Sequence, residues 1–354
     1  MATEHHSSVN SSDIVYDSGF PAAKVVPREV SVALFVSFFI FIVCGNIWVL
    51  LAVARQPKLR KSSTCMFIIS LSISDLMMAI FFIPTQLAYV AFDLTMTNVV
   101  LCKGSGWLHW VAQCATIFSL LGIGVDRYRA IVQPLRPRLT RKDALTCISI
   151  IWICAMTYSY YRLHILDIVT RTYPVGVNTT VSIAMCTISM EKHCVLQYMQ
   201  ISDFLVMYLV PLLILCAMYF IMISSLWFSA SPNNASKNKK RKAVKMLSFV
   251  VVLFGITWFP WRFFSLYFDF ADPDSIPISM YVWSDVIAAS CIASYLANSW
   301  VNPIVYAYFN ENFRKEFYLL FPCLKWKDQS RVGPNQGTIK TVTGRSIAHN
   351  NTIT

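Results

Sequence analysis

Seven long apolar segments, separated by short polar stretches, form the dominant pattern of this chain. Inside a bilayer no water is available to backbone groups, so each segment must be helical to satisfy its own hydrogen bonds. About 20 residues are enough to cross the apolar layer, and most of the segments reach that length. The pattern predicts an all-α membrane protein, a seven-transmembrane helix bundle with segments at residues 30–54, 63–90, 99–132, 144–166, 196–227, 244–268 and 281–309.

A further helix is expected directly after the seventh segment. Phe313, Phe317 and Leu320 share one helical face, with basic side chains beside it. Such a pattern predicts a short amphipathic eighth helix lying on the inner leaflet and touching membrane lipids. The predicted regions are an extracellular N-terminal tail (1–29), the transmembrane domain (30–309), the amphipathic helix (310–322) and a cytoplasmic C-terminal tail (323–354).

Composition and charge agree with a multi-pass membrane protein. The chain of 354 residues is 56% hydrophobic and only 14% charged, whereas soluble domains carry about 25% charged residues. The net charge of +12 could indicate nucleic acid, but 23 of the 30 lysines and arginines fall in the four segments expected inside the cell. This bias predicts a plasma-membrane protein with its N-terminus outside and its C-terminus inside, and no nucleic-acid partner. The outer segments are more acidic than basic and would attract a cationic ligand.

Polar side chains recur within four of the apolar segments. An unpaired polar group is costly there and calls for a partner or a function. The residues concerned are Asn46, Asp75, Thr116, Asn298, Ser299 and Asn302. Oxygen ligands suit a small hard cation, so two interpretations stay open: an allosteric sodium ion, or a water-filled polar network in which Asp75 is protonated. No other metal site and no cofactor are expected.

Prolines interrupt several segments, and each removes a backbone hydrogen bond and permits a kink. Those deepest in the last three segments are Pro211, Pro260 and Pro303, and Trp258 lies close to Pro260. Hinges in three helices suit a bundle with two alternative packings.

At the inner end of the third segment stands Asp126-Arg127-Tyr128, an acid–base pair followed by a tyrosine. One tripeptide recurs by chance, but short motifs lie in every helix and follow in order. They are Gly45-Asn46, Leu71 to Asp75, Cys102, Asp126 to Tyr128, Trp152, Pro211 with Tyr219, Phe254 to Pro260, and Asn302 to Tyr306. With these motifs the chain resembles the rhodopsin-like (class A) G-protein-coupled receptors, and residues 126–140 resemble those of neuropeptide receptors. Thr116 and Thr257 depart mildly from the family pattern.

The resemblance implies a switch at the inner face. Arg127 would pair with Asp126 at rest and be released on activation, while Tyr219 and Tyr306 move inward. The opened cavity would receive the C-terminal helix of a G-protein α subunit, a helix-in-groove contact. The residues implied in coupling are Asp126, Arg127, Tyr128, Pro134, Leu135, Tyr219, Lys245, Asn302, Pro303 and Tyr306.

The resemblance also implies a packing switch deeper in the bundle, above which the ligand binds. Its residues are Ile117, Pro211, Phe254, Trp258 and Pro260. It further implies sodium at Asp75, Thr116 and Asn298.

A disulfide from Cys102 to the second outer loop is implied as well. Its partner is Cys186 or Cys194; we favour Cys186, which lies within a predicted strand, over Cys194, which adjoins the fifth segment. Asn10 and Asn178 begin glycosylation sequons on the outer side. Cys323 follows the amphipathic helix and is either palmitoylated or a plain thiol.

Two residues that other receptor classes need are missing from this sequence, and their absence limits the type of ligand. Receptors resembling the opsins need a lysine in the seventh segment, and none lies between Lys245 and Lys315. Amine receptors carry aspartate where this chain has His109. The expected ligand-binding residues are Gln86, His109, Gln113, Asp203, Trp261, Arg262, Asp285 and Tyr295. Asp203 and Arg262 would either pair with each other or receive a polar, zwitterionic or amidated ligand end.

These observations favour a receptor for an extracellular peptide that activates heterotrimeric G proteins, with arrestins and receptor kinases as further partners. Alternatives are a receptor for a small molecule, a constitutively active receptor, and a non-signalling scavenger or dimer partner. A transporter or channel is disfavoured because the sequence has neither an internal repeat nor a continuous path of paired charges. An enzyme is not expected, since no nucleophile–base or metal-ligand set is present.

Overall fold

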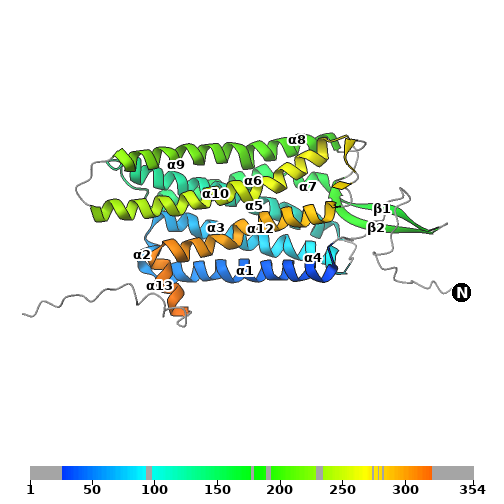
Figure 1. Cartoon of the computed structure of the whole chain (residues 1–354), viewed down its shortest axis with the longest axis horizontal. Helices are drawn as coiled ribbons and strands as arrows, with labels where there is room; N and C mark the ends of the chain where they lie inside the picture. The colour runs from blue at the N-terminus through cyan, green and yellow to red at the C-terminus, as the bar shows by residue number, and fades with distance from the viewer. Residues whose placement is uncertain are drawn as a thin grey trace, which may run out of the picture.

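The computed structural model describes residues 26–92, 98–176, 179–188, 193–228, 234–272, 275–277, 279–280 and 283–320. Long helices run side by side in one bundle, and a two-stranded hairpin projects from the end at which α4, α7 and α8 lie (Figure 1). The helices α2 and α13 lie at the opposite end. The chain is thus an all-α membrane bundle with one β-hairpin outside it.

The crossing helices follow the predicted apolar segments, with breaks in three of them. Their bounds are α1 (Arg28–Arg55), α3 (Ser63–Phe81) with α4 (Ile83–Phe92), α5 (Val99–Val132), α6 (Arg141–Ser159) with α7 (Arg162–Ile165), α8 (His193–Phe204) with the π-helix η3 (Leu205–Leu209) and α9 (Val210–Phe228), α10 (Asn234–Phe270), and α12 (Ser284–Phe309). The short helices α2 (Pro57–Arg60) and α13 (Glu311–Leu320) lie outside the crossings.

Six helical segments of the described chain are long and apolar enough to span a membrane. The seventh crossing is α12, which has 26 residues. It carries Asn298, Ser299 and Asn302, which lower its hydropathy and are nearly or fully buried in the bundle. Polar groups facing the interior of a bundle are compatible with a crossing because they avoid lipid.

The structure differs from the predicted helical segments in three places. Residues 229–242 were expected to be a loop, but α10 begins at Asn234, because the lysine-rich run contains good helix formers and no proline. The second crossing breaks at Phe82, just before Pro84, which has no backbone N–H to continue the preceding helix. The fourth crossing is interrupted after Ser159, resumes in α7 and ends at Ile165, one residue before the predicted end, and the chain enters a strand at Leu166.

A proline also explains the π-helical turn in the fifth crossing. Pro211 lacks the N–H that would bond to the carbonyl of Met207 in an α-helix. The chain widens into η3 over Leu205–Leu209 directly before this proline. The hydroxyl of Tyr208, within η3, donates to the carbonyl of Gly255 at 2.9 Å. The widened turn is thereby attached to α10.

Small and polar side chains tie the helices together. A Cβ placed at Gly45 of α1 would lie 3.0 Å from Cγ of Pro303, so glycine permits α1 to approach the kinked α12 closely. The indole N–H of Trp152 donates to the hydroxyl of Ser70 at 3.1 Å, and Ser70 bonds in turn to Ser119 at 2.9 Å. These bonds join α6, α3 and α5.

The hairpin consists of β1 (Leu166–Gly176) and β2 (Thr179–Ile188), which pair antiparallel with Ile168 opposite Cys186. Cys186 forms a disulfide with Cys102 near the start of α5. The prediction of this pair is therefore confirmed, and Cys194 is an exposed free thiol.

Candidate functional site

A buried charged cluster lies where α5, α7, α8 and α10 meet, in the half of the bundle nearer the β-hairpin, which is expected to be the outer half. Asp203 of α8 is fully buried and forms ion pairs with Arg162 of α7 and, at 3.9 Å, with Arg262 of α10. The hydroxyl of Tyr158 donates to the second oxygen of Asp203 at 3.0 Å. The sequence-based pairing of Asp203 with Arg262 is thus joined by a second arginine, which makes the closer contact.

Neutral side chains extend this cluster along α5. Nη2 of Arg262 donates to Oε1 of Gln113 at 3.0 Å, and Gln113 bonds in turn to Nε2 of His109 at 2.7 Å. The His109 ring stacks on Phe82, with ring centres 4.5 Å apart. The cluster therefore links predicted ligand-binding residues of three helices through two hydrogen bonds and one ion pair.

Aromatic rings surround the two arginines. The guanidinium carbon of Arg162 lies 3.3 Å from the ring centre of Trp110, and that of Arg262 lies 5.3 Å from the ring centre of Trp258. Both contacts are cation–π arrangements, which gain strength away from water. The charged cluster thus packs against aromatic rings, and Trp258 with the rings around it is called the aromatic floor below.

The remaining predicted ligand-binding residues are less closely connected. Tyr295 is buried, with its ring centre 5.1 Å from that of Trp258, and its hydroxyl contacts the sulfur of Met78. Trp261 and Gln86 are half-buried. Asp285 lies in α12, but its side chain is outside the described part of the structure.

Below this level, large side chains fill the centre of the bundle. Trp258 and Phe254 are fully buried, with ring centres 5.4 Å apart, and Ile117 is fully buried as well. Phe254 also lies against Tyr208 of η3, at 6.0 Å. The rings therefore form a continuous contact from the proline-induced π-turn to the aromatic floor.

A polar layer surrounds Asp75. Its two carboxylate oxygens accept hydrogen bonds from Ser299 at 2.7 Å and from Asn302 at 3.4 Å. The Asn46 side chain donates to the backbone carbonyl of Ser299 at 3.1 Å. Thr116 bonds to Ser74 at 2.8 Å. The described residues thus join α1, α3, α5 and α12 at one depth.

The donor set of this layer fits a small hard cation in its chemistry. It offers one carboxylate with hydroxyl and amide oxygens, the ligands that such ions prefer. The side-chain nitrogen of Asn298 is buried and has no hydrogen-bond partner within the described chain.

At the inner end of α5, Asp126 is buried and contacts three side chains. Nη2 of Arg127 lies 3.0 Å from Oδ2, Ser63 donates to Oδ1 at 2.8 Å, and Thr64 donates to Oδ2. Ser63 and Thr64 are the first two residues of α3. The carboxylate therefore holds Arg127 and fastens α5 to α3 at the same time.

The other predicted coupling residues divide by exposure. Tyr219 and Tyr306 are buried, and the Tyr306 hydroxyl has no hydrogen-bond partner in the described chain. Lys245 is exposed, as is Pro134, while Leu135 is 99% exposed. An apolar side chain presented fully at the inner face is suited to contact a partner. Tyr128 is half-buried.

Comparison with known proteins decides the family of this arrangement. The profile of the family described as "7 transmembrane receptor (rhodopsin family)" matches residues 45–306. This range runs from α1 to α12 and exceeds half of the chain. The protein belongs to the rhodopsin family of seven-transmembrane receptors.

Several characterised receptors are similar to this rhodopsin-family receptor over most of their length. Galanin receptor 2a from Danio rerio is 33% identical over 300 residues, which cover 82% of this chain and 77% of that receptor. Neuropeptide FF receptor 2 from Mus musculus is 31% identical over 336 residues, covering 89% and 77%. Galanin receptor type 1 from Homo sapiens is 30% identical over 311 residues, covering 86% and 84%.

Sequence reasoning missed several residues of the receptor's polar sites. Arg162, to which the sequence assigned no role, is 95% buried beside Asp203. Tyr158, Ser63, Thr64 and Ser74 carry no charge, and their roles depend on which helices pack together. Only Arg162 could have been found from the sequence. It is a basic residue near the end of the fourth apolar segment, and the fifth segment contains an acidic residue that could pair with it.

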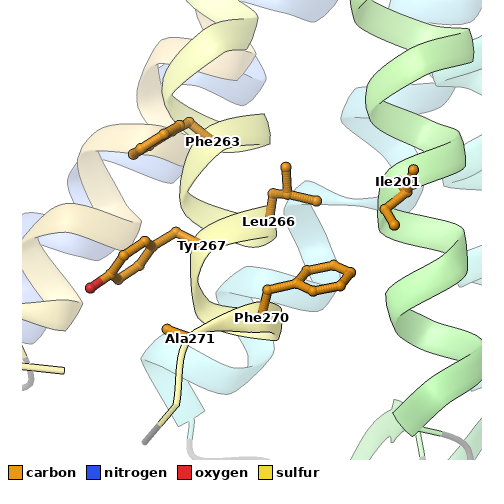
Figure 2. A pocket seen from close by; sticks show the side chains of 6 residues that line it. All are labelled: Ile201, Phe263, Leu266, Tyr267, Phe270 and Ala271. Carbon is orange, nitrogen blue, oxygen red and sulfur yellow. The ribbon is translucent and has the colours of Figure 1, made fainter. Parts of the chain in front are cut away.

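An apolar cavity of about 500 Å³ lies between α8 and α10 of the receptor. Leu266 and Phe270 point toward Ile201 of α8, whereas Phe263 and Tyr267 point to the other side of α10 (Figure 2). None of its six lining residues belongs to the predicted ligand-binding set. Because its lining is almost entirely apolar, lipid hydrocarbon would suit it.

Three predicted modification sites fall outside the described residues. They are the sequon asparagines Asn10 and Asn178 and the thiol of Cys323.

Proposed function

We propose that this receptor binds an extracellular peptide and, when occupied, activates heterotrimeric G proteins on the inner side. The observation that carries the proposal is the continuity of contacts through the bundle. The cluster of Arg262 and Asp203 rests on Trp258, Trp258 packs on Phe254, and Phe254 contacts the π-turn of the fifth crossing. A ligand that changes the outer cluster therefore changes the packing of α10 against its neighbours.

The peptide character of the ligand is supported by the relatives, which are named as galanin and neuropeptide FF receptors. The excess of acidic residues in the outer segments would also steer a basic peptide toward the receptor. The β-hairpin, fastened to α5 by its disulfide, would form part of the surface that a peptide meets.

Activation would open the inner end of the bundle. Pro260 lies within α10 and provides a hinge. Outward movement of the inner part of α10 would expose Arg127 to the α subunit of a G protein, with Tyr219 and Tyr306 as flanking contacts. A ligand shifts such an equilibrium only by its difference in affinity for the two packings.

Further parts of the proposal concern the setting of the receptor. It would lie in the plasma membrane with its N-terminus outside, and sodium bound at Asp75 would stabilise the resting packing. Basal nucleotide exchange measured with sodium, and then with a large organic cation instead, tests the ion. Arrestins and receptor kinases would act on the occupied receptor.

The central test combines a ligand screen with one substitution. A peptide library is applied to cells expressing the receptor, with calcium and cyclic AMP as readouts. For an active peptide, Arg127→Ala should abolish most agonist-driven nucleotide exchange because the G protein loses its central contact. Equal exchange by Arg127→Ala and the native receptor, at equal surface expression, would contradict the proposal.

A further inference from the structure

Among the described residues, the charged cluster of the outer half contains one more positive than negative charge. Arg162, Asp203 and Arg262 are 5%, 0% and 2% exposed. Both guanidiniums approach the same carboxylate oxygen, Oδ2 of Asp203. Two fixed cations and one anion leave a net charge of +1 in the interior of a membrane protein, where an unbalanced ion is strongly unfavourable.

The surroundings of the two arginines contain no second anion within the described chain. Arg262 donates to the neutral amide of Gln113 and to the sulfur of Met207. Arg162 stacks on Trp110. Asp75, another buried carboxylate, accepts its hydrogen bonds from Ser299 and Asn302. The charge is therefore balanced by nothing that the described residues provide.

Both guanidiniums also keep unused donors. Nε of Arg162 and Nε of Arg262 are buried and have no hydrogen-bond partner in the described part of the receptor. A guanidinium presents its N–H groups in a planar fork that matches a carboxylate with two parallel bonds. The missing component thus has a definite chemistry: an anion with two oxygens in one plane.

We infer that a carboxylate of the ligand enters this cluster and completes it between Arg162 and Arg262. The inference rests on the proposed function, since it specifies which part of a peptide the receptor recognises. The carboxylate is either the free C-terminus of the peptide or the side chain of an aspartate or glutamate. An amidated, non-acidic peptide would leave the positive charge unbalanced.

The position of the cluster connects this recognition to signalling. Arg162 belongs to α7 and Arg262 to α10, so a carboxylate bound between them draws these two elements together. Arg262 also lies over Trp258. Binding of the carboxylate would therefore alter the contact between α10 and the aromatic floor, the element that must move for the inner end to open.

The first test places the missing anion by substitution. Gln113→Glu replaces the amide oxygen that already accepts from Arg262 with a carboxylate of the same shape. The ligand-free purified receptor should melt roughly 2–4 °C higher than the native protein. The control is Gln56→Glu, which adds the same charge at the inner end of α1 and should bring no such gain.

A second variant guards against a substitution that fails to fold. Arg262→Gln removes the excess cation and leaves Asp203 paired with Arg162. Its melting temperature should equal or exceed that of the native receptor. A loss of stability in both Gln113→Glu and Arg262→Gln would overturn the inference, because neither result is compatible with an unbalanced cation.

The second test uses pools of synthetic random octapeptides. Each pool is prepared with a free C-terminus or a C-terminal amide, and with or without aspartate and glutamate. The native receptor should respond to pools with a carboxylate at concentrations at least about tenfold lower than to amidated, non-acidic pools. Gln113→Glu and Arg262→Gln should lose this preference.

The outcomes separate the inference from the function on which it rests. A response to free-acid pools assigns the C-terminus, and a response to amidated acidic pools assigns a side chain; both support the inference. Equal potency of amidated, non-acidic pools would overturn it while leaving peptide activation intact. Silence of every pool would contradict the proposed function, and the melting temperatures would then decide the inference.

Discussion

At the scale of single residues, the resting state of the inner face depends on what surrounds Asp126. Arg127 is its neighbour in sequence, but the carboxylate is held in place from α3, by the hydroxyls of Ser63 and Thr64. A hydrogen bond to a charged group contributes about 1.5–3 kcal/mol. The strength of the Asp126–Arg127 contact is therefore set by two residues outside the Asp-Arg-Tyr motif.

Thr64→Val should consequently raise ligand-independent activity. Valine keeps the shape of threonine but leaves Asp126 with one hydroxyl fewer, so the closed packing loses stability relative to the open one. We expect basal nucleotide exchange to increase by roughly tenfold. Thr146→Val is the matched control, because Thr146 is exposed on α6 and bonds only to a backbone carbonyl of its own helix. Unchanged basal exchange in Thr64→Val would show that Asp126 needs no anchor on α3.

At the scale of elements, close approach of helices limits which residues the bundle tolerates. A Cβ at Gly122 of α5 would lie 2.7 Å from two ring carbons of Phe67, which is almost fully buried in α3. A rigid ring in a packed interior cannot move aside without displacing its neighbours. Contact between α3 and α5 therefore depends on the absence of a side chain at this position.

Gly122→Ala should destabilise the receptor by about 1–3 kcal/mol through overpacking. Gly104→Ala, in the same helix, meets nothing within 4 Å and should be neutral or slightly stabilising, since alanine favours a helix over glycine. Thermal unfolding of the purified variants in one detergent measures both. Equal melting temperatures for the two variants would contradict the steric argument.

Much of the element pattern could be predicted from the sequence, and the exceptions have definite causes. Apolar length locates the crossings because a bilayer imposes it. Pro211 predicts an irregular helix, because it cannot donate a backbone hydrogen bond. The helix can respond with a kink or with a π-turn, and the packing of the bundle determines that it forms η3. Arg162 shows why the site was harder to predict than the fold. It is buried beside Asp203 of another helix, and no local sequence pattern reveals that contact.

At the scale of the whole molecule, the disulfide fixes the outer hairpin to the bundle. Cys102 lies in the first turn of α5, and Cys186 lies within β2. Without this bond, the described contacts of the hairpin with the bundle are its chain connection to α7 and its packing on α5, which includes the ion pair of Lys103 with Asp167 at 3.9 Å. The outer surface would lose its defined shape, while the inner face would remain as it is.

Cys186→Ser should therefore weaken peptide binding more than it affects basal exchange. We expect an affinity loss of at least about tenfold, since an unfixed loop must be ordered when the ligand binds. Cys194→Ser removes an exposed free thiol nearby and is the matched control. Binding by Cys186→Ser at native affinity would show that the hairpin takes no part in recognition.

The length of α10 has a mechanical consequence. This helix has 37 residues, and its proline lies far from its N-terminal end. At about 1.5 Å per residue, the stretch from Asn234 to Pro260 forms a lever arm roughly 39 Å long. A bend of about 10° at the pivot would carry the tip sideways by about 7 Å. If the proposed activation tilts the helix near Trp258, this lever arm would turn a slight rotation into a much larger displacement at the far end of α10.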